Sequence, residues 1–128
     1  MNINDQILRV EGLTKVFGAG RTQVRAVDGV DLCACAGEIL LIMGPSGSGK
    51  TTLLTMIGGL LRPTSGRVFI DGVEITALRQ GELPRVRRHH VGFIFQTFNL
   101  LESLTALENV EVALNVAGVG GHDARERA

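Results

Sequence analysis

The sequence predicts an α/β fold in which two antiparallel strands, each with one face on a core, precede a strand that is buried on both faces. Residues 6–17 and 24–34 alternate in part between apolar and polar side chains, which is typical of half-buried strands. Residues 39–43 are continuously apolar and lie between Gly37 and Gly44, which is typical of a strand in a parallel sheet. This change of pattern predicts an antiparallel part joined to the start of a parallel one.

Four further elements follow along the chain. Residues 50–61 predict a helix, because they carry apolar side chains at helical spacing, namely Leu53, Leu54, Ile57 and Leu60. Residues 62–72 are typical of a turn, a strand and a second turn, since they contain Pro, Gly and an Asp-Gly pair. A short helix is expected within residues 79–88, and it leads into a strand at residues 91–96.

Two capping signals place helices in the last part of the sequence. Thr105 precedes an apolar pattern and is followed three residues later by Glu108, which predicts a capping box. Asp123 is expected to cap another helix, of which the sequence carries about the first turn. A helix this short is marginal by itself, so the sequence looks interrupted rather than finished.

Composition limits the classes of protein that fit. The chain has 128 residues, 45% of them hydrophobic, and 13 basic residues balance 13 acidic ones. This composition fits one globular domain or part of one, and the charge balance gives no global attraction to nucleic acid. Residues 39–43 form the longest apolar run and are too short to cross a membrane, and the N-terminus lacks a secretory-signal pattern, so a cytosolic protein is expected.

Two cysteines lie close together in the second predicted strand. Cys33 and Cys35 are two residues apart, so a strand places both on one face in an arrangement that does not suit a bridge between them. We expect small core residues. The alternative is a metal or redox pair, for which the chain offers no other cysteine.

The segment after the buried strand has the pattern of a phosphate-binding loop. Gly44, Gly49, Lys50 and Thr51 have the required spacing, with a predicted strand before them and a predicted helix after them. Glycines let consecutive backbone N–H groups converge on a polyphosphate, and the helix adds its positive end. The residues predicted to bind the nucleotide here are Gly44, Pro45, Ser46, Gly47, Ser48, Gly49, Lys50, Thr51 and Thr52.

Within this loop the side chains have distinct predicted roles. Lys50 is expected to reach the β- and γ-phosphates, and the Thr51 hydroxyl to hold Mg²⁺. Thr52 offers one more donor to the α-phosphate. The alternative interpretation is a glycine-rich turn with a solvated lysine.

Residues farther along narrow the class of nucleotide-binding protein. The stretch VGFIFQTFNLLESLTALENV, residues 91–110, resembles the glutamine loop of the ATP-binding subunits of ATP-binding-cassette (ABC) transporters. Residues 13–20, 26–32, 44–72 and 87–101 together resemble the lipoprotein-release, macrolide-export and cell-division group of that family. The resemblance covers nearly the whole chain.

The resemblance implies a fold and a domain. Residues 1–128 would be the N-terminal part of a single ABC-type nucleotide-binding domain, with an antiparallel β-subdomain and the start of a parallel RecA-like P-loop NTPase core. The family's signature sequence, the acidic pair that serves Mg²⁺ and the attacking water, and the switch histidine are absent from these residues. Their family order places them beyond Ala128.

Two further site residues follow from the resemblance. Phe17 lies where the family places an aromatic ring, usually Tyr, that stacks on adenine; the alternative is that Phe17 merely closes the first strand. Gln96 would contact Mg²⁺ and the attacking water and report the nucleotide state to the membrane subunit. An ordinary polar residue at the end of a strand is the alternative for Gln96.

The resemblance also implies partners. Phe98, Asn99, Leu100 and Leu101 would help to receive a short helix of a transmembrane permease subunit, although packing under the last helix is an alternative. A second ATP-binding subunit would complete a dimer, on the cytoplasmic face of the inner membrane.

A basic cluster is the one feature that invites a nucleic-acid interpretation. It comprises Arg79, Arg85, Arg87, Arg88, His89 and His90. The run is short, Glu82 interrupts it and no aromatic platform accompanies it, so we expect a solvated helix face or a contact with headgroups or a partner, and no nucleic acid. The adjacent histidines point in different directions in most backbones, which argues against joint metal ligation.

The functional prediction is therefore an ABC transporter ATPase that uses ATP and Mg²⁺ to drive export or extraction. Residues 1–128 alone are expected to bind ATP without turning it over, because the loop neutralises charge but no base is present. The alternatives are an ABC ATPase of DNA repair or translation, which has no membrane subunit, and a non-functional truncated remnant.

Overall fold

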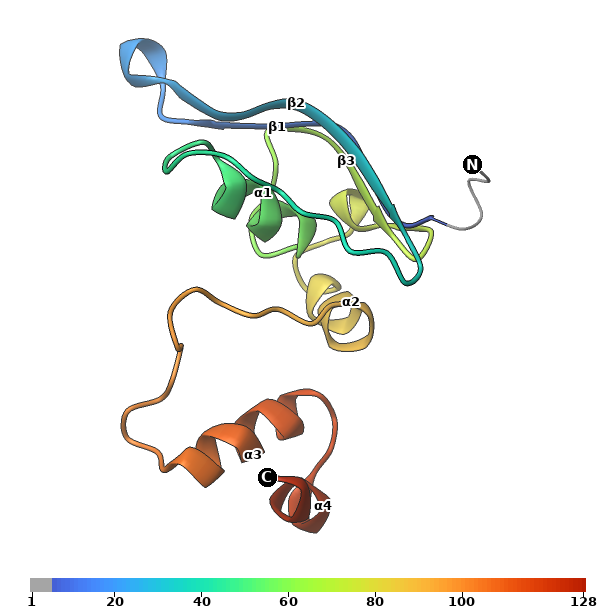
Figure 1. Ribbon diagram of the computed structural model, residues 1–128, viewed down its shortest axis with the longest axis vertical. Helices are drawn as coiled ribbons and strands as arrows, with labels where there is room; N and C mark the ends of the chain where they lie inside the picture. The colour runs from blue at the N-terminus through green and yellow to red at the C-terminus, as the bar shows by residue number, and fades with distance from the viewer. Residues whose placement is uncertain (1–5) are drawn as a thin grey trace. The chain divides into compact units, whose positions relative to one another are not determined.

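The computed structural model describes residues 6–128, which form two compact units. The first unit ends at Pro84, and the second runs from Arg85 to Ala128 (Figure 1). Each unit is described by itself below.

An antiparallel sheet of four strands organises the first unit. Its order is β2-β1-β3-β4, with β1 at Gln6–Phe17, β2 at Val24–Cys35, β3 at Ser65–Ile70 and β4 at Val73–Glu74. The expected strands at residues 6–17 and 24–34 and the strand within residues 62–72 are confirmed, as is the antiparallel pairing of the first two. The short turn Gly20–Thr22 (η2) joins β1 to β2.

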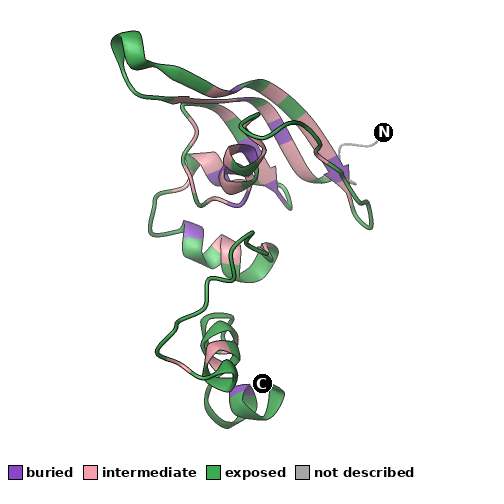
Figure 2. Cartoon of the chain, turned by 60° about the vertical axis from the view of Figure 1, so that its left-hand side comes forward, coloured by how far each residue is buried: buried purple, intermediate pink, exposed green. Residues whose placement is uncertain are grey.

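The core of the first unit lies between the sheet and a helix. Val10, Leu13 and Val68 are buried on β1 and β3, where Val10 and Val68 are direct register partners. Helix α1, Lys50–Ile57, buries Leu53 and Met56 (Figure 2). The helix expected at residues 50–61 is thus confirmed, although it ends at the Gly-Gly pair. Leu54 and Leu60 of the predicted apolar face are exposed.

Short elements complete the first unit and lead into the second. A turn at Ile75–Ala77 (η3) follows β4, and helix α2 covers Leu83–His90. The short helix expected within residues 79–88 therefore forms, but it begins later and continues further. In the last turn of α2, the Arg87 carbonyl accepts a hydrogen bond from the Val91 N–H at 3.2 Å.

Two predicted strands do not form, which corrects the sequence prediction. Residues 39–43 and 91–96 belong to none of the four strands, and Ile39 is 94% exposed and Ile94 98% exposed. A strand needs a neighbour whose backbone groups complete its ladder, and none of the described residues pairs with either segment. Continuous apolar patterning predicts that a segment is covered in its domain, but not which strand covers it.

The second unit contains two helices after an irregular segment. Helix α3 covers Ala106–Val116 and helix α4 covers Gly121–Arg127. Ala124 of α4 is buried, and the Arg125 guanidinium lies 3.7 Å from the Glu111 carboxylate of α3. Most other side chains of this unit are at least partly exposed (Figure 2).

The helix ends in this unit confirm one capping prediction and correct the other. Thr105 caps α3, and its side chain and that of Glu108 make the reciprocal bonds of a capping box. The cap of α4 is Gly120, whereas Asp123 lies inside the first turn, where a carboxylate still favours the helix dipole. Over residues 6–128, no helix is both long and apolar enough to cross a membrane.

Candidate functional site

The predicted phosphate-binding loop lies directly before helix α1. Gly49 is the N-cap residue of α1 and adopts a left-handed conformation, with φ of 87°. The Leu53 N–H donates to the Gly49 carbonyl at 2.8 Å, so the helical ladder begins with Leu53. The N–H groups of Lys50, Thr51 and Thr52 precede that bond and have no acceptor within the helix. They are available to an external anion.

Two glycines give the loop its curvature. Gly47 and Gly49 have φ values of 79° and 87°, which other residues rarely adopt. Alternation of right- and left-handed residues turns successive N–H groups toward one point, an arrangement that binds anions. Gly49 is also held against β2, because an added Cβ would lie 2.1 Å from the Ala26 carbonyl oxygen. The loop is therefore curved and fixed to the sheet.

Lys50 reaches back across the loop. Its ammonium donates to the carbonyls of Gly44 at 2.7 Å and Pro45 at 2.6 Å, and to the Ser48 hydroxyl at 3.2 Å. The Ser48 N–H donates to the Pro45 carbonyl at 3.3 Å and closes the turn. A cation is thus held beside convergent donors, which is the arrangement that a polyphosphate requires.

An open hollow of about 430 Å³ adjoins the loop. It is lined by β2 residues 25–28 and Val30, by the extended segment 42–45, and by residues 48–50 with Leu53. The hollow joins the phosphate loop to the edge strand β2.

Phe17 lies at the end of β1. Its register partner is Val24, the first residue of β2, and Phe17 is 43% exposed. The Lys15 ammonium lies 5.2 Å from the centre of the Phe17 ring and donates to the Arg62 carbonyl at 2.7 Å. The ring is accessible, as stacking requires, and a fixed cation lies beside it.

Gln96 belongs to the second unit. It lies in an exposed bend before Phe98 and Leu100, which are 93% and 62% exposed. Asn99 has a positive φ of 52° and Leu101 is 50% exposed, so residues 98–101 form an exposed apolar turn. The alternative interpretation is packing of residues 98–101 under the last helix; Phe98 and Leu100 are too exposed for such packing, whereas Leu101 is half-exposed.

Asn109 organises the chain after this turn, and the sequence analysis missed it. Its Oδ1 accepts the Leu101 N–H at 2.8 Å, and its Nδ2 donates to the Leu101, Leu104 and Thr105 carbonyls at 3.2, 3.2 and 2.9 Å. A single amide thereby fixes the segment to α3. An Asn inside a helical pattern, just after a capping box, is the signal that could have found it.

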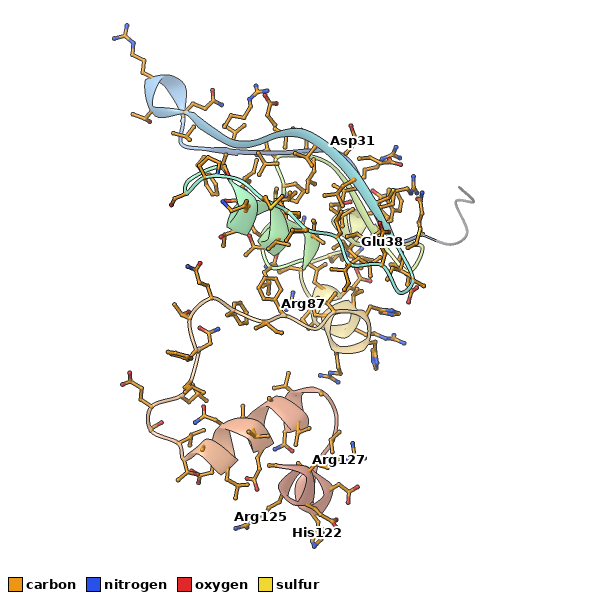
Figure 3. All side chains as sticks on the ribbon, viewed as in Figure 1. Asp31, Glu38, Arg87, His122, Arg125 and Arg127 are labelled. Carbon is orange, nitrogen blue, oxygen red and sulfur yellow. The ribbon has the colours of Figure 1, made fainter. Side chains whose placement is uncertain are left out.

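Among the described residues 6–128, Glu108 is the one whose pKa the fold clearly changes. The backbone N–H and the hydroxyl of Thr105 donate to its carboxylate at 2.7 Å, and they lower the pKa of Glu108 below its ordinary value. Arg125 of α4, which is labelled in Figure 3, adds a smaller lowering effect on this pKa. The charged form of Glu108 is part of the α3 cap.

The remaining candidate residues are distributed as follows. Cys33 and Cys35 form no disulfide within residues 6–128 and are of intermediate burial, which is less buried than core residues would be. In the basic cluster, Arg87, Arg88, His89 and His90 fall in the last turn of α2, where positive charge favours the helix dipole.

The fold and the loop together define a class of protein. An antiparallel sheet carries a glycine-curved loop at the N-terminus of a helix, with a lysine ammonium across the loop. These residues fit a nucleotide polyphosphate, and the class is that of the P-loop nucleotide-binding domains.

Comparison with known proteins identifies the family. The family described as ABC transporter matches residues 27–128, and the chain belongs to it. An uncharacterized ABC transporter ATP-binding protein of Mycobacterium bovis is 48% identical over 121 residues, covering 94% of this chain and 37% of that protein. The solved dimeric ATP-binding cassette MJ0796, in a post-hydrolysis state with ADP and Pi, matches with a TM-score of 0.87 and 43% identity. The match covers 94% of this chain and 53% of the cassette, and it confirms the predicted fold class.

Two named relatives differ in the direction of transport. The methionine import ATP-binding protein MetN of Corynebacterium diphtheriae is 44% identical, over 98% of this chain and 36% of that protein. The macrolide export ATP-binding/permease protein MacB of Hyphomonas neptunium is also 44% identical, over 95% of this chain and 19% of that protein. The chain thus spans between about a fifth and two fifths of the length of the three named relatives, and about half of the solved cassette.

Proposed function

We propose that this chain provides the nucleotide-binding part of an ABC transporter subunit that binds MgATP and drives export or extraction through a membrane partner. The observation that carries the proposal is the loop before α1, where the N–H groups of residues 50–52 have no helical acceptor and the Lys50 ammonium lies beside them. Hydrolysis of ATP is general to the family, so the bound nucleotide would serve as the energy source.

Each predicted residue has a place in this proposal. Residues 44–49 would wrap the phosphates, with backbone N–H groups from Ser46 onward as donors, and Lys50 would exchange a loop carbonyl for the β- and γ-phosphates. Thr51 would hold Mg²⁺ through its hydroxyl. Phe17 would stack on adenine with its exposed ring face, and Gln96 would complete the Mg²⁺ and water contacts.

Residues 1–128 would form the N-terminal part of a single nucleotide-binding domain. We expect these residues alone to bind ATP without turning it over, since none of the residues assigned above acts as a general base. Binding and turnover are therefore separate measurements on this protein.

The proposed partners are a permease subunit and a second ATP-binding subunit, with the protein on the cytoplasmic face of the membrane. Support comes from the exposed apolar turn at residues 98–101 and from the dimeric cassette that resembles this chain. Export or extraction is preferred because the sequence motifs resemble the macrolide-export group, to which the named MacB relative belongs.

Substitution of Lys50 tests the nucleotide site. Lys50→Ala should weaken MgATP binding by about 10- to 100-fold, because it removes a charge-assisted contact to the phosphates. Isothermal titration calorimetry on the purified full-length protein measures this change. Arg88→Ala removes the same charge from exposed α2 and should leave the affinity unchanged. An affinity for MgATP within two-fold of wild type in Lys50→Ala would contradict the proposed function.

A further inference from the structure

Arg25 is a second cation beside the phosphate loop. It lies on β2 and lines the same hollow as Gly49 and Lys50. Its Nη1 donates to the Asp28 carboxylate at 2.7 Å, and both side chains are well exposed, at 59% and 66%. An exposed pair of this kind contributes little to stability, so the fold gives no strong reason for these charges to meet here.

The register of the sheet places Arg25 between two parts of the proposed site. Ala26, the next residue, touches Gly49 of the phosphate loop. Val24, the preceding residue, is the partner of Phe17. Two residues of a strand span roughly 7 Å, which is similar to the length of a ribose between a base and its α-phosphate.

A local irregularity directs this part of β2. Val16 pairs with Arg25 and Lys15 pairs with Val27, so Ala26 is an extra residue in the ladder. Such a bulge redirects the side chains beside it and recurs next to functional sites. Here the Arg25 and Asp28 side chains, three residues apart, meet in a hydrogen bond, whereas unbroken alternation along a strand would place them on opposite faces.

We propose that Arg25, positioned by Asp28, binds the ribose and α-phosphate portion of the nucleotide. This inference rests on the proposed function, because it assumes that Phe17 receives the base and the loop receives the phosphates. The guanidinium offers five donors in a fixed fork, and Asp28 occupies one side of it. The remaining donors suit sugar hydroxyls and a phosphate oxygen together.

A comparison of ATP with ADP, which differ in the number of phosphates, distinguishes binding at this subsite from binding at the loop. Arg25→Gln should lower the affinities for ATP and ADP by the same factor, about 5- to 20-fold, because both ligands carry the ribose and α-phosphate. Lys50→Ala should lower the affinity for ATP more than the affinity for ADP, because the Lys50 ammonium contacts the outer phosphates. Calorimetric titration of the purified full-length protein with each Mg²⁺-nucleotide gives these factors without any turnover.

Matched variants define the outcome. Arg21→Gln removes an exposed arginine from the tip of the same hairpin and should leave both affinities unchanged. Asp28→Asn should give a smaller loss than Arg25→Gln, equal again for ATP and ADP. Arg25→Gln and Asp28→Asn should unfold at the wild-type temperature within the error of the measurement, since the Arg25–Asp28 pair is exposed.

Three results would overturn the inference, and they identify which assumption fails. Unchanged affinities in Arg25→Gln, together with a clear loss in Lys50→Ala, reject the subsite and leave the proposed function in place. A loss in Arg25→Gln that is larger for ATP than for ADP assigns Arg25 to the outer phosphates instead. Unchanged affinities in both variants reject the proposed function and the subsite with it.

Discussion

Gly49 shows how one residue joins the loop to the sheet. Its φ of 87° disfavours any side chain, and an added Cβ would lie 2.1 Å from the Ala26 carbonyl oxygen. Gly47 has a similar φ of 79°, but nothing lies within 4 Å of an added Cβ. A comparison of the two glycines therefore distinguishes the energetic cost of a left-handed backbone from the cost of a close contact with the Ala26 carbonyl.

Substitution by alanine should distinguish these costs. Gly47→Ala should lower the free energy of unfolding by about 1–2 kcal/mol, through left-handed strain alone. Gly49→Ala should lower it by about 3 kcal/mol or more and abolish ATP binding, since backbone must move to relieve the overlap. Urea unfolding and nucleotide titration measure both quantities. Equal destabilisation by the two substitutions would show that the Ala26 contact has no energetic weight.

The sequence could predict those residues whose roles depend on their immediate neighbours in the chain. The spacing of Gly44, Gly49 and Lys50 is a property of consecutive residues, and the structure has the loop at the start of a helix as expected. The positions of Arg25 and Asn109 depend on a bulge in the ladder and on a segment eight residues away. For Arg25, no pattern of neighbouring residues contains that information. For Asn109, the local pattern shows an Asn just after a capping box but not its bonds to Leu101, which emerged only from the structure.

The start of helix α3 is an element whose stability depends on pH. The pKa of Glu108 is lowered in the fold by its bonds to Thr105, so the charged form is favoured when α3 is capped. Stability from this group is complete above the ordinary carboxyl pKa and is lost as the pH falls through the lowered value. Acid should therefore weaken the start of α3.

Glu108→Gln tests this coupling. At about pH 6 the variant should be less stable than wild type, because a neutral amide is a weaker acceptor for the Thr105 N–H and hydroxyl. The difference should shrink as the pH falls through the lowered pKa of Glu108, because the carboxylate then becomes protonated. Urea midpoints across this range measure it, and the pH-dependent difference should be smaller in a Thr105→Ala background. A difference that does not change with pH would exclude the charged cap.

At the scale of elements, burial and strand pairing are separate predictions. The helices at residues 50 and 106 could be predicted because their hydrogen bonds and caps lie within the same segment. Residues 39–43 and 91–96 have the composition of buried strands, but their ladder bonds must come from other segments. The prediction of these two strands was wrong for that reason, although the segments have the apolar composition on which it was based.

At the scale of the whole molecule, the two units present different surfaces to their surroundings. The first unit carries the proposed phosphate loop and a buried core. The second carries the exposed apolar turn at residues 98–101, whose last residue, Leu101, is held to α3 by two hydrogen bonds with Asn109. Exposed apolar side chains on a fixed backbone are typical of an interaction surface, because little ordering entropy remains to be lost on binding.

The apolar turn should decide attachment to a membrane partner without affecting nucleotide binding. Phe98→Ser with Leu100→Ser removes side chains that are 93% and 62% exposed, and it should lower co-purification with the permease at least about ten-fold, because each buried side chain contributes about 1.5–3 kcal/mol. Val116→Ser is the matched control, since Val116 is 65% exposed but lies at the other end of α3. Quantitative recovery from detergent-solubilised membranes measures association, and titration with ATP verifies that the site is intact. If the control lowers recovery as much as the double variant, attachment depends on general surface hydrophobicity; if neither does, the partner binds elsewhere on the molecule.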